Sequence, residues 1–523
     1  MRWDPREQPC IPALTTGLRA DGPRTVTVTA VDALRHADEL AAVYGDTPGE
    51  TAALLEWLLG LLYAAGHHPT DEDEWRDWVL TPEPLAPAAD WLARHEGVWD
   101  LFDPVRPLGQ NAALRPHLAA FGTGPAQLVI EHAGDYNQHF DHRHLHHPAP
   151  LPADRAWRAM LAQHTFGQGR RARIPAKEMG LPAPFTNLSS CRLGSRVRVF
   201  ALGRTLGETL RLNLVPWEPD PDVEPHRRSG TLNLSWGDRA DRRPFARTGG
   251  HETRLPDGPA DYHTVLGRSI VLRPVRLPGG TLGVDRVLVG PGETLGVLPA
   301  AYRDDEVLTM RGKKAEVFRP RRSRELWCEA HALYAAAPTE RTKGQDLYGR
   351  LASLRGLRPE LWAVGLLAEK GTPIAWVSDH FPYVPGREAD LRHASEQGSV
   401  IAEYAATALQ KAAAAACAVE YPNPKPADQA AQLARFNGEP ELWAGAGTEF
   451  HDLLGGVADG EAVHTLLAAY GRAIRGLATA ALGARLHSRR SGPSLHARIR
   501  AEERLTAELN HRTAPVPLRE AIP

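Results

Sequence analysis

The chain has 523 residues, of which 42% are hydrophobic, and its formal net charge is −2. This length suggests two or three domains, and the apolar content is enough for a sizeable core. The near-neutral charge excludes a uniformly basic nucleic-acid-binding protein, so any contact with a polyanion has to come from local patches.

The opening stretch MRWDPREQPC lacks the apolar segment of a signal peptide. The most apolar run, residues 52–66, is interrupted by Glu56 and is too short to span a bilayer. We therefore expect a cytoplasmic protein that makes no membrane contact. The cysteines lie far apart and form no C-x-x-C pair, which predicts reduced thiols rather than a zinc knuckle or a disulfide framework. They are Cys10, Cys191, Cys328 and Cys417.

Residues 47–69 predict a helix. Thr47 and Glu50 have the spacing of a capping box, Pro48 suits the first helical position, and Gly66 supplies the stop. Leucines recur along one stripe, which must pack on a core. These are Leu54, Leu55, Leu58, Leu59 and Leu62.

From about residue 70 to 385 the chain is rich in proline and glycine. Short β-like runs such as residues 196–202 and 269–275 alternate with helical pieces such as residues 153–164. This pattern indicates an irregular α+β body with long loops.

After residue 385 the composition shifts to alanine, leucine, glutamate and arginine, which favours amphipathic helices. Four are predicted, over residues 399–421, 440–457, 462–486 and 494–512. We therefore predict an α+β fold with an N-terminal domain of residues 1–385 and a C-terminal four-helix bundle of residues 386–523.

Six histidines fall between His132 and His147. They could contact nucleic acid, ligate a metal or simply face solvent. A structural zinc site needs about four ligands at fixed geometry, and this segment has irregular spacing and no cysteine. We predict no metal, no other cofactor and no catalytic residue. A metal-dependent hydrolase that uses residues 132–147 and a scaffold that binds only proteins remain the alternative functions.

Basic residues gather beside glycines in several places, where guanidinium groups and exposed amides would suit a phosphate backbone. The alternative is that these side chains are solvated surface arginines. The patches cover residues 167–177, residues 310–324, and Arg192, Arg196, Arg198, Arg204 and Arg211. The last predicted helices add Arg485, Arg489, Arg490, Arg498 and Arg500.

Several stretches, taken in order, resemble one family, the large subunit of the type I-E CRISPR Cascade complex, or CasA family. They are WDPREQPCIPAL at residues 3–14 and the segments 91–110, 201–220 and 258–275. The segment ALGRTLGETLRLNLVPWEPD at 201–220 is the most specific match. A C-terminal helical bundle also follows in that family.

The resemblance implies a subunit without enzymatic activity that recognises the protospacer-adjacent motif of double-stranded DNA in the N-terminal domain. It implies that the subunit promotes strand opening and R-loop formation and recruits a helicase–nuclease. Guide RNA pairing then carries the sequence readout, as in other RNA-guided effectors. The implied partners are target DNA, the 5′ end of the guide RNA, the backbone and small subunits of the complex, and the helicase–nuclease.

The resemblance also assigns roles to residues. Its glycine loop, which contacts the DNA motif, falls on Gly167, Gly169, Arg170 and Arg171. Its strand-separating wedge falls on the hairpin tip Glu369, Lys370, Gly371 and Thr372. A nucleic-acid-contacting loop falls on Phe140, Asp141, His142 and Arg143. Arg286 is the nearest cation to the family's minor-groove lysine. From the basic patches we predict that Lys313, Lys314, Arg485, Arg489 and Arg490 contact the DNA backbone and the displaced strand. The alternative is that the C-terminal arginines pair with Glu502, Glu503 and Glu508.

Overall fold

The computed structural model describes most of the chain, and it divides into two compact units. The described residues are 1–17, 22–132, 149–171, 175, 177–178, 180, 187–194, 196–216, 229–238, 253–296, 308–311, 314–317, 319–320, 326–335, 347–423, 425–487 and 494–519. The first unit comprises residues 1–323, 338–354 and 359–380, and the second comprises 324–337, 355–358 and 381–523. Within the described ranges, every helix is too short or too polar to traverse a lipid bilayer.

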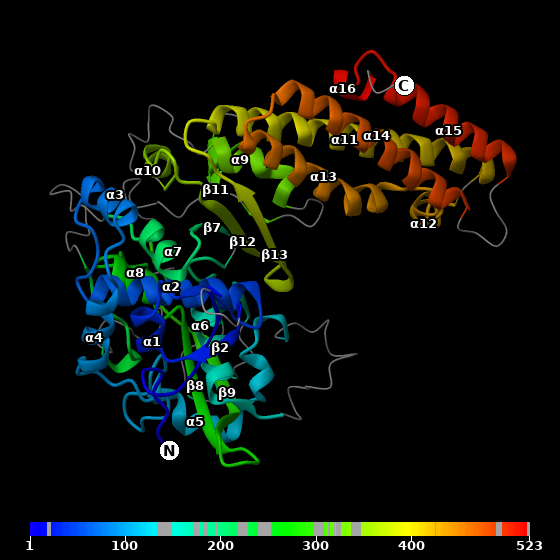
Figure 1. The fold of residues 1–523 in the computed structure, drawn as a ribbon. Helices are drawn as coiled ribbons and strands as arrows, with labels where there is room; N and C mark the ends of the chain where they lie inside the picture. Colours follow the sequence, from blue (N-terminus) through cyan, green and yellow to red (C-terminus); the bar gives the residue numbers. More distant parts are fainter. Residues whose placement is uncertain are drawn as a thin grey trace. The chain divides into compact units, whose positions relative to one another are not determined.

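The first unit combines short antiparallel sheets with helices, as Figure 1 shows. Its three-stranded sheets have the orders β2-β1-β3, β13-β12-β7 and β4-β9-β8, and β5-β6 and β10-β11 form two-stranded pairs. The strands are β1 Ile11–Thr15, β2 Thr25–Val28, β3 Leu40–Val43, β4 Leu151–Pro152, β5 Arg170–Arg171, β6 Asn187–Leu188, β7 Val197–Leu202, β8 Arg268–Arg276, β9 Leu282–Pro291, β10 Leu308–Arg311, β11 Lys314–Val317, β12 Glu360–Glu369 and β13 Thr372–Pro382. The helices are α1 Ala30–Arg35, α2 Pro48–Ala64, α3 Glu72–Leu80, α4 Ala86–Arg94, α5 Arg115–Phe121, α6 Ala153–Phe166, α7 Leu206–Asn213, α8 Pro259–Thr264 and α10 Leu347–Ser353.

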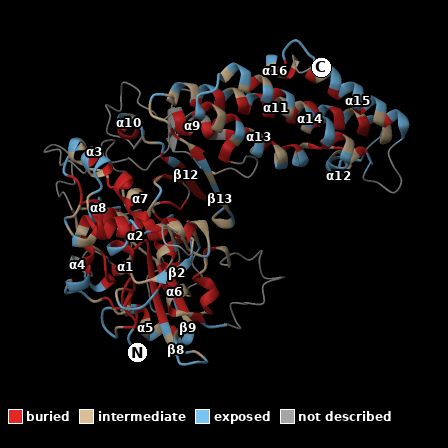
Figure 2. Cartoon of the chain, in the orientation of Figure 1, coloured by how far each residue is buried: buried red, intermediate tan, exposed pale blue. Residues whose placement is uncertain are grey.

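Helix α2 is the central element of this unit. It begins where the sequence predicts, with the Thr47 side chain accepting a hydrogen bond from the Glu50 amide and the Glu50 carboxylate accepting one from the Asp46 amide. The predicted stripe of leucines is buried, but so is nearly every other residue of the helix (Figure 2). A helix buried on all sides belongs to the interior of a unit rather than to its surface.

Aromatic rings pack around this helix. The Trp57 and Trp157 rings lie 5.0 Å apart, edge to face, and Trp3 and Trp99 extend the cluster at 6.0 Å and 6.4 Å. Edge-to-face aromatic pairs add about 0.5–1.5 kcal/mol beyond their burial. The cluster therefore joins the N-terminal segment to α2 and α6.

Glu56 lies inside this apolar helix with no solvent exposure. Its carboxylate pairs with Arg192, with Arg198 Nε at 2.8 Å and with His263 Nδ1 at 2.6 Å. Burial alone would raise the pKa of Glu56, but these three groups together hold it well below its ordinary value. The charge that interrupts the apolar run is thus the centre of a buried ionic cluster.

The second unit is a bundle of long helices. Helix α11 (Glu388–Glu420) packs on α13 (Glu439–Asp459), α14 (Val463–His487) and α15 (Leu495–Leu509), and the short helices α12 (Gln429–Ala434) and α16 (Val516–Arg519) complete it. These four long helices match the predicted ones, although α11 starts at Glu388, well before the predicted start at Ser399. The predicted α+β fold with a C-terminal helical bundle is confirmed.

A preceding segment also belongs to the second unit. It contains a 3₁₀ turn at Leu326–Glu329 and helix α9 (Ala330–Ala335). Trp327 inserts its ring 4.9 Å from Phe450 and 5.5 Å from Trp443 of the bundle. Compactness alone does not show that a unit folds independently, so the domain boundary near residue 385 stays a prediction.

Replacing Glu56 by glutamine should lower the free energy of unfolding of the first unit by about 3–5 kcal/mol. The substitution removes the negative charge that two buried arginines face, and their remaining contacts do not replace it. Urea unfolding followed by tryptophan fluorescence measures this. Glu7→Gln is the matched control, because Glu7 is exposed and its ion pair with Arg2 is exposed too, and it should change stability by less than about 0.5 kcal/mol. Equal stability of the Glu56→Gln and wild-type proteins would contradict the role of the cluster.

Acid should remove the stability that Glu56 contributes. Since its folded-state pKa lies well below the ordinary value, the unfolded chain binds more protons between the two values. The contribution is therefore complete above about pH 4.3, the unfolded pKa, and is lost as pH falls through the folded pKa. The difference in unfolding free energy between wild type and Glu56→Gln should therefore shrink as pH falls below about 4. A difference that grew below about pH 4 would have the wrong sign.

Candidate functional site

The predicted glycine loop starts at the end of α6. Helix α6 ends at Phe166, and the Gly167 amide donates to the Gln163 carbonyl at 3.1 Å as the chain leaves the helix. Arg170 and Arg171 then form the strand β5, which pairs antiparallel with Leu188 and Asn187 of β6. The sequence predicts a loop here, but in the structure Arg170 and Arg171 belong to a short two-stranded antiparallel ribbon.

A buried arginine binds the main chain of the glycine loop. Arg268, at the start of β8, is 2% exposed. Its guanidinium donates to the carbonyls of Gln168 and Ser189, both at 2.8 Å, and of Gly267 at 2.9 Å. Burial lowers the pKa of Arg268 from its ordinary value, and no carboxylate of the described residues is paired with it. Arginine nevertheless stays protonated in proteins, so the loop carbonyls solvate a buried positive charge.

The glycines of the loop allow this close packing. A Cβ on Gly167 would lie 2.6 Å from Arg268 Nη2, and one on Gly169 would lie 3.1 Å from Ser190 Oγ. The Gly169 amide already donates to Ser190 Oγ at 3.2 Å. The expectation that glycine amides donate to a phosphate is therefore not met at Gly167 or Gly169. Contacts to an anion would have to come from the neighbouring side chains.

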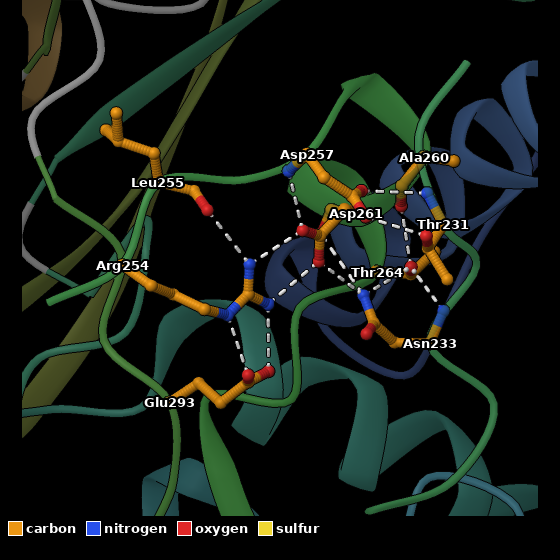
Figure 3. A network of polar contacts seen from close by, with 9 residues as sticks. All are labelled: Thr231, Asn233, Arg254, Leu255, Asp257, Ala260, Asp261, Thr264 and Glu293. Atoms are coloured by element: carbon orange, nitrogen blue, oxygen red, sulfur yellow. Dashed lines mark hydrogen bonds and ion pairs between the residues drawn. The ribbon is translucent and has the colours of Figure 1, made fainter. Parts of the chain in front are cut away.

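Figure 3 shows a second polar network, which is centred on Arg254. Arg254 forms paired hydrogen bonds with Asp261 at 2.6 Å and 2.8 Å and with Glu293 at 2.7 Å and 3.1 Å. These partners raise the pKa of Arg254 although burial opposes them. The Glu293 amide in turn donates to the Leu266 carbonyl, just before Arg268. The network thus links the segment around Arg254 to α8 and to the chain just after β9, which bonds the chain just before Arg268.

The predicted hairpin tip is a two-residue turn between β12 and β13. Lys370 has φ = 50° and Gly371 has φ = 78°. Positive φ at both central residues is the type I′ geometry that matches the twist of hairpin strands. Glu369 and Lys370 are exposed, while Gly371 and Thr372 are half-buried.

The hairpin tip lies against the glycine loop. A Cβ on Gly371 would overlap the Gly169 carbonyl oxygen and would lie 3.2 Å from Arg170 Cβ. Arg171 and Lys370 are exposed, and no carboxylate of the described residues is paired with either. Two segments far apart in the sequence therefore meet and bring cationic side chains to one place.

Other predicted residues are placed differently. Arg286 lies on β9 and donates to the Ala119 carbonyl of α5. Arg485 lies on α14 and pairs with Glu441 at 2.6 Å. Lys314 begins β11. The rest of the predicted contact residues, Phe140, Asp141, His142, Arg143, Lys313, Arg489 and Arg490, lie outside the described residues.

One predicted basic patch is wrong for three of its five arginines. Arg192, Arg198 and Arg211 are internal: the first two pair with Glu56, and Arg211 pairs with Asp38. Buried guanidiniums that are already paired cannot offer a phosphate-binding surface. Arg204, whose side chain is 92% exposed, remains on the surface.

The alternative of a metal site concerned the histidines of residues 132–147, most of which lie outside the described residues. Of the six histidines from 132 to 147, only His132 lies within the described ranges. Elsewhere in those ranges, no group of three or more His, Cys, Asp or Glu side chains is arranged to hold a metal ion. All four cysteines are described and buried, and none of them forms a disulfide, in agreement with the prediction of reduced thiols.

The chain is similar to known proteins of one family. The family described as CRISPR-associated protein Cse1 matches residues 9–481. The chain belongs to the Cse1 family. This confirms the resemblance found in the sequence. A Cse1 relative from Thermus thermophilus, CRISPR-associated protein CasA/Cse1, is 29% identical over 339 residues, which cover 62% of this chain and 59% of the relative.

Solved Cse1 structures share the fold. CasA from Thermus thermophilus has a TM-score of 0.72 at 20% identity, covering 98% of this chain and 100% of that one. Cse1 from Acidimicrobium ferrooxidans has a TM-score of 0.71 at 21% identity, covering 100% and 99%. A chain of a structure described as a CRISPR RNA-guided surveillance complex has a TM-score of 0.66 at 19% identity, covering 97% and 99%.

Sequence reasoning missed two residues that organise this site, Arg268 and Trp376. Arg268 immediately precedes the apolar run SIVL, and a lone charge at the start of a buried strand signals a buried polar contact. Trp376 lies on β13 and contacts the end of α6 through Phe166 at 5.0 Å. Its signal is a large aromatic residue on an otherwise partly exposed strand.

Replacing Gly371 by alanine should displace the glycine loop. The added methyl would overlap the Gly169 carbonyl, so trypsin should cleave after Arg170 and Arg171 about fivefold faster, as expected if local opening becomes easier by about 1 kcal/mol. Gly280→Ala is the control: Gly280 has φ = 86°, and a Cβ there would have no neighbour within 4 Å. The same acceleration in both variants would attribute the effect to backbone strain rather than to the contact.

Proposed function

We propose that this Cse1-family chain is a non-enzymatic subunit of an RNA-guided surveillance complex. It recognises the protospacer-adjacent motif of double-stranded DNA, promotes strand opening and R-loop formation, and recruits a helicase–nuclease. Its proposed partners are target DNA, the 5′ end of the guide RNA and the other subunits of the complex. Family membership supports this role, as does the shared fold with a protein in a CRISPR RNA-guided surveillance complex.

The observation that carries the proposal is the contact between the hairpin tip and the glycine loop. Gly371 packs on the main chain of Gly169 and on the Cβ of Arg170, so Lys370 and Arg171 belong to neighbouring segments. A protein that separates the strands of a duplex needs both cations for the phosphates and a rigid element against the end base pair. This contact would supply both within one small surface.

The shape of the two segments also suits the minor groove, which is about 6 Å wide. A two-residue turn and a short ribbon of two strands are among the thinnest main-chain elements available. Since the Gly169 amide is engaged by Ser190, base edges and phosphates would be contacted by side chains such as Arg171 and Lys370.

Removing the cation at the hairpin tip should slow strand opening more than it weakens DNA association. In the assembled complex, Lys370→Ala should lower the opening rate about tenfold, which corresponds to ~1.4 kcal/mol, with association changed less than about twofold. Fluorescence of 2-aminopurine next to the motif reports opening, and filter binding reports association. Arg94→Ala on α4 removes an exposed arginine of the same unit and should change neither. Equal loss of both quantities would count against a wedge.

Reversing the charge of Arg170 and Arg171 should weaken association with all DNA sequences alike. Phosphate contacts carry no sequence information, and each lost contact should reduce the dependence of affinity on salt concentration by about one counterion. Binding of the assembled complex to duplexes with a randomised flank, repeated at several salt concentrations, measures both. Loss of affinity for one motif only would identify these arginines as base-reading residues instead.

A further inference from the structure

We propose that Trp376 is the positioning residue that holds the hairpin tip against the glycine loop, and that Gly49 provides the space for its ring. This inference rests on the proposed function, because it assigns the tip a fixed place during strand opening. Trp376 does not itself belong to the tip. It lies further along β13 than Thr372 and is half-buried.

The indole ring fills a space that α2 leaves open. A Cβ on Gly49 would lie 2.6 Å from Trp376 Cζ3 and closer still to two other carbons of the six-membered ring. Glycine is a poorer helix former than alanine. Gly49 lies in the first turn of α2, and the Trp376 ring explains why that position has no side chain.

The same ring contacts the root of the glycine loop. Its centroid lies 5.0 Å from that of Phe166, and the two planes meet at 87°. Phe166 is the last residue of α6, so the next residue is Gly167. Any movement of the hairpin away from the loop would therefore break this edge-to-face contact.

The indole N–H is also bound. It donates to the carboxylate of Glu131, in the 3₁₀ turn Ile130–His132. In the sequence, that turn precedes the segment with the predicted contact residues Phe140 to Arg143. Trp376 thus contacts Phe166, which precedes the glycine loop, and Glu131, which precedes in the sequence the segment with Phe140 to Arg143.

The expected effect of Gly49→Ala separates this proposal from simple helix stability. Helix propensity predicts a neutral or slightly stabilising change. Overpacking that displaces the Trp376 ring predicts instead that strand opening slows about tenfold while DNA association changes less than about twofold. The probe is a duplex complementary to the guide, with a flank selected from a randomised pool by the wild-type complex.

A rescue experiment makes the test specific. Phenylalanine lacks the outer carbons of the indole that face Gly49, so Trp376→Phe leaves room for a methyl group there. The double variant Gly49→Ala/Trp376→Phe should open DNA faster than Gly49→Ala alone and as fast as Trp376→Phe. Non-additivity of this kind is expected for residues that are in contact, whereas distant and independent residues have additive effects.

The outcomes distinguish this proposal from the one on which it rests. If Lys370→Ala slows opening but Gly49→Ala does not, or if Trp376→Phe fails to rescue Gly49→Ala, the positioning role is overturned and the proposed function stands. If Lys370→Ala leaves opening unchanged, the wedge function itself fails. Trp376→Phe keeps the test informative if Gly49→Ala does not fold, since loss of the ring's outer edge and its N–H should slow opening on its own.

Discussion

The first unit depends on a carboxylate that lies where water cannot reach it. An unpaired charge in such a place costs several kcal/mol, so burial of Glu56 requires arginines and a hydrogen-bonding histidine from elsewhere in the chain. Arg192 and Arg198 flank the start of β7, and His263 lies near the end of the short helix α8. Their convergence fixes how β7 and α8 pack on α2, and it fixes the chain that follows β6 at the base of the candidate site.

The same principle shapes the glycine loop. Arg268 has no carboxylate partner among the described residues, and main-chain carbonyls on both sides of the loop bind it instead. Those carbonyls can approach only because Gly167 has no side chain. The glycines therefore serve the packing of the interior, and the exposed cation of the neighbouring ribbon, Arg171, faces outward. Gly167 therefore has no side chain because the buried Arg268 occupies the space that a side chain would need.

Much of the architecture could be predicted from local signals. The cap at Thr47 and Glu50 marks the start of α2, and apolar runs mark β7 and β8. The hairpin turn at Lys370 and Gly371 also has a local signal, because few residue pairs suit two positive φ angles. Such features depend on neighbours in the sequence. Whether an arginine is buried does not depend on its sequence neighbours. Arg192 and Arg204 look alike in the sequence, but Arg192 is buried because it pairs with the distant Glu56, whereas Arg204 lies at the surface. The meeting of the hairpin tip with the glycine loop has no local signal either.

The buried cluster also has a consequence for biosynthesis. Glu56 leaves the ribosome 136 residues before Arg192 and 207 residues before His263. At about 5–20 residues per second, the helix that carries it waits roughly 10–40 seconds for its last partner. Until α8 is made, the part of α2 that packs on it has no partner, so the nascent chain presents that apolar surface to chaperones. N-terminal pieces that end before residue 263 would leave Glu56 without its full set of partners.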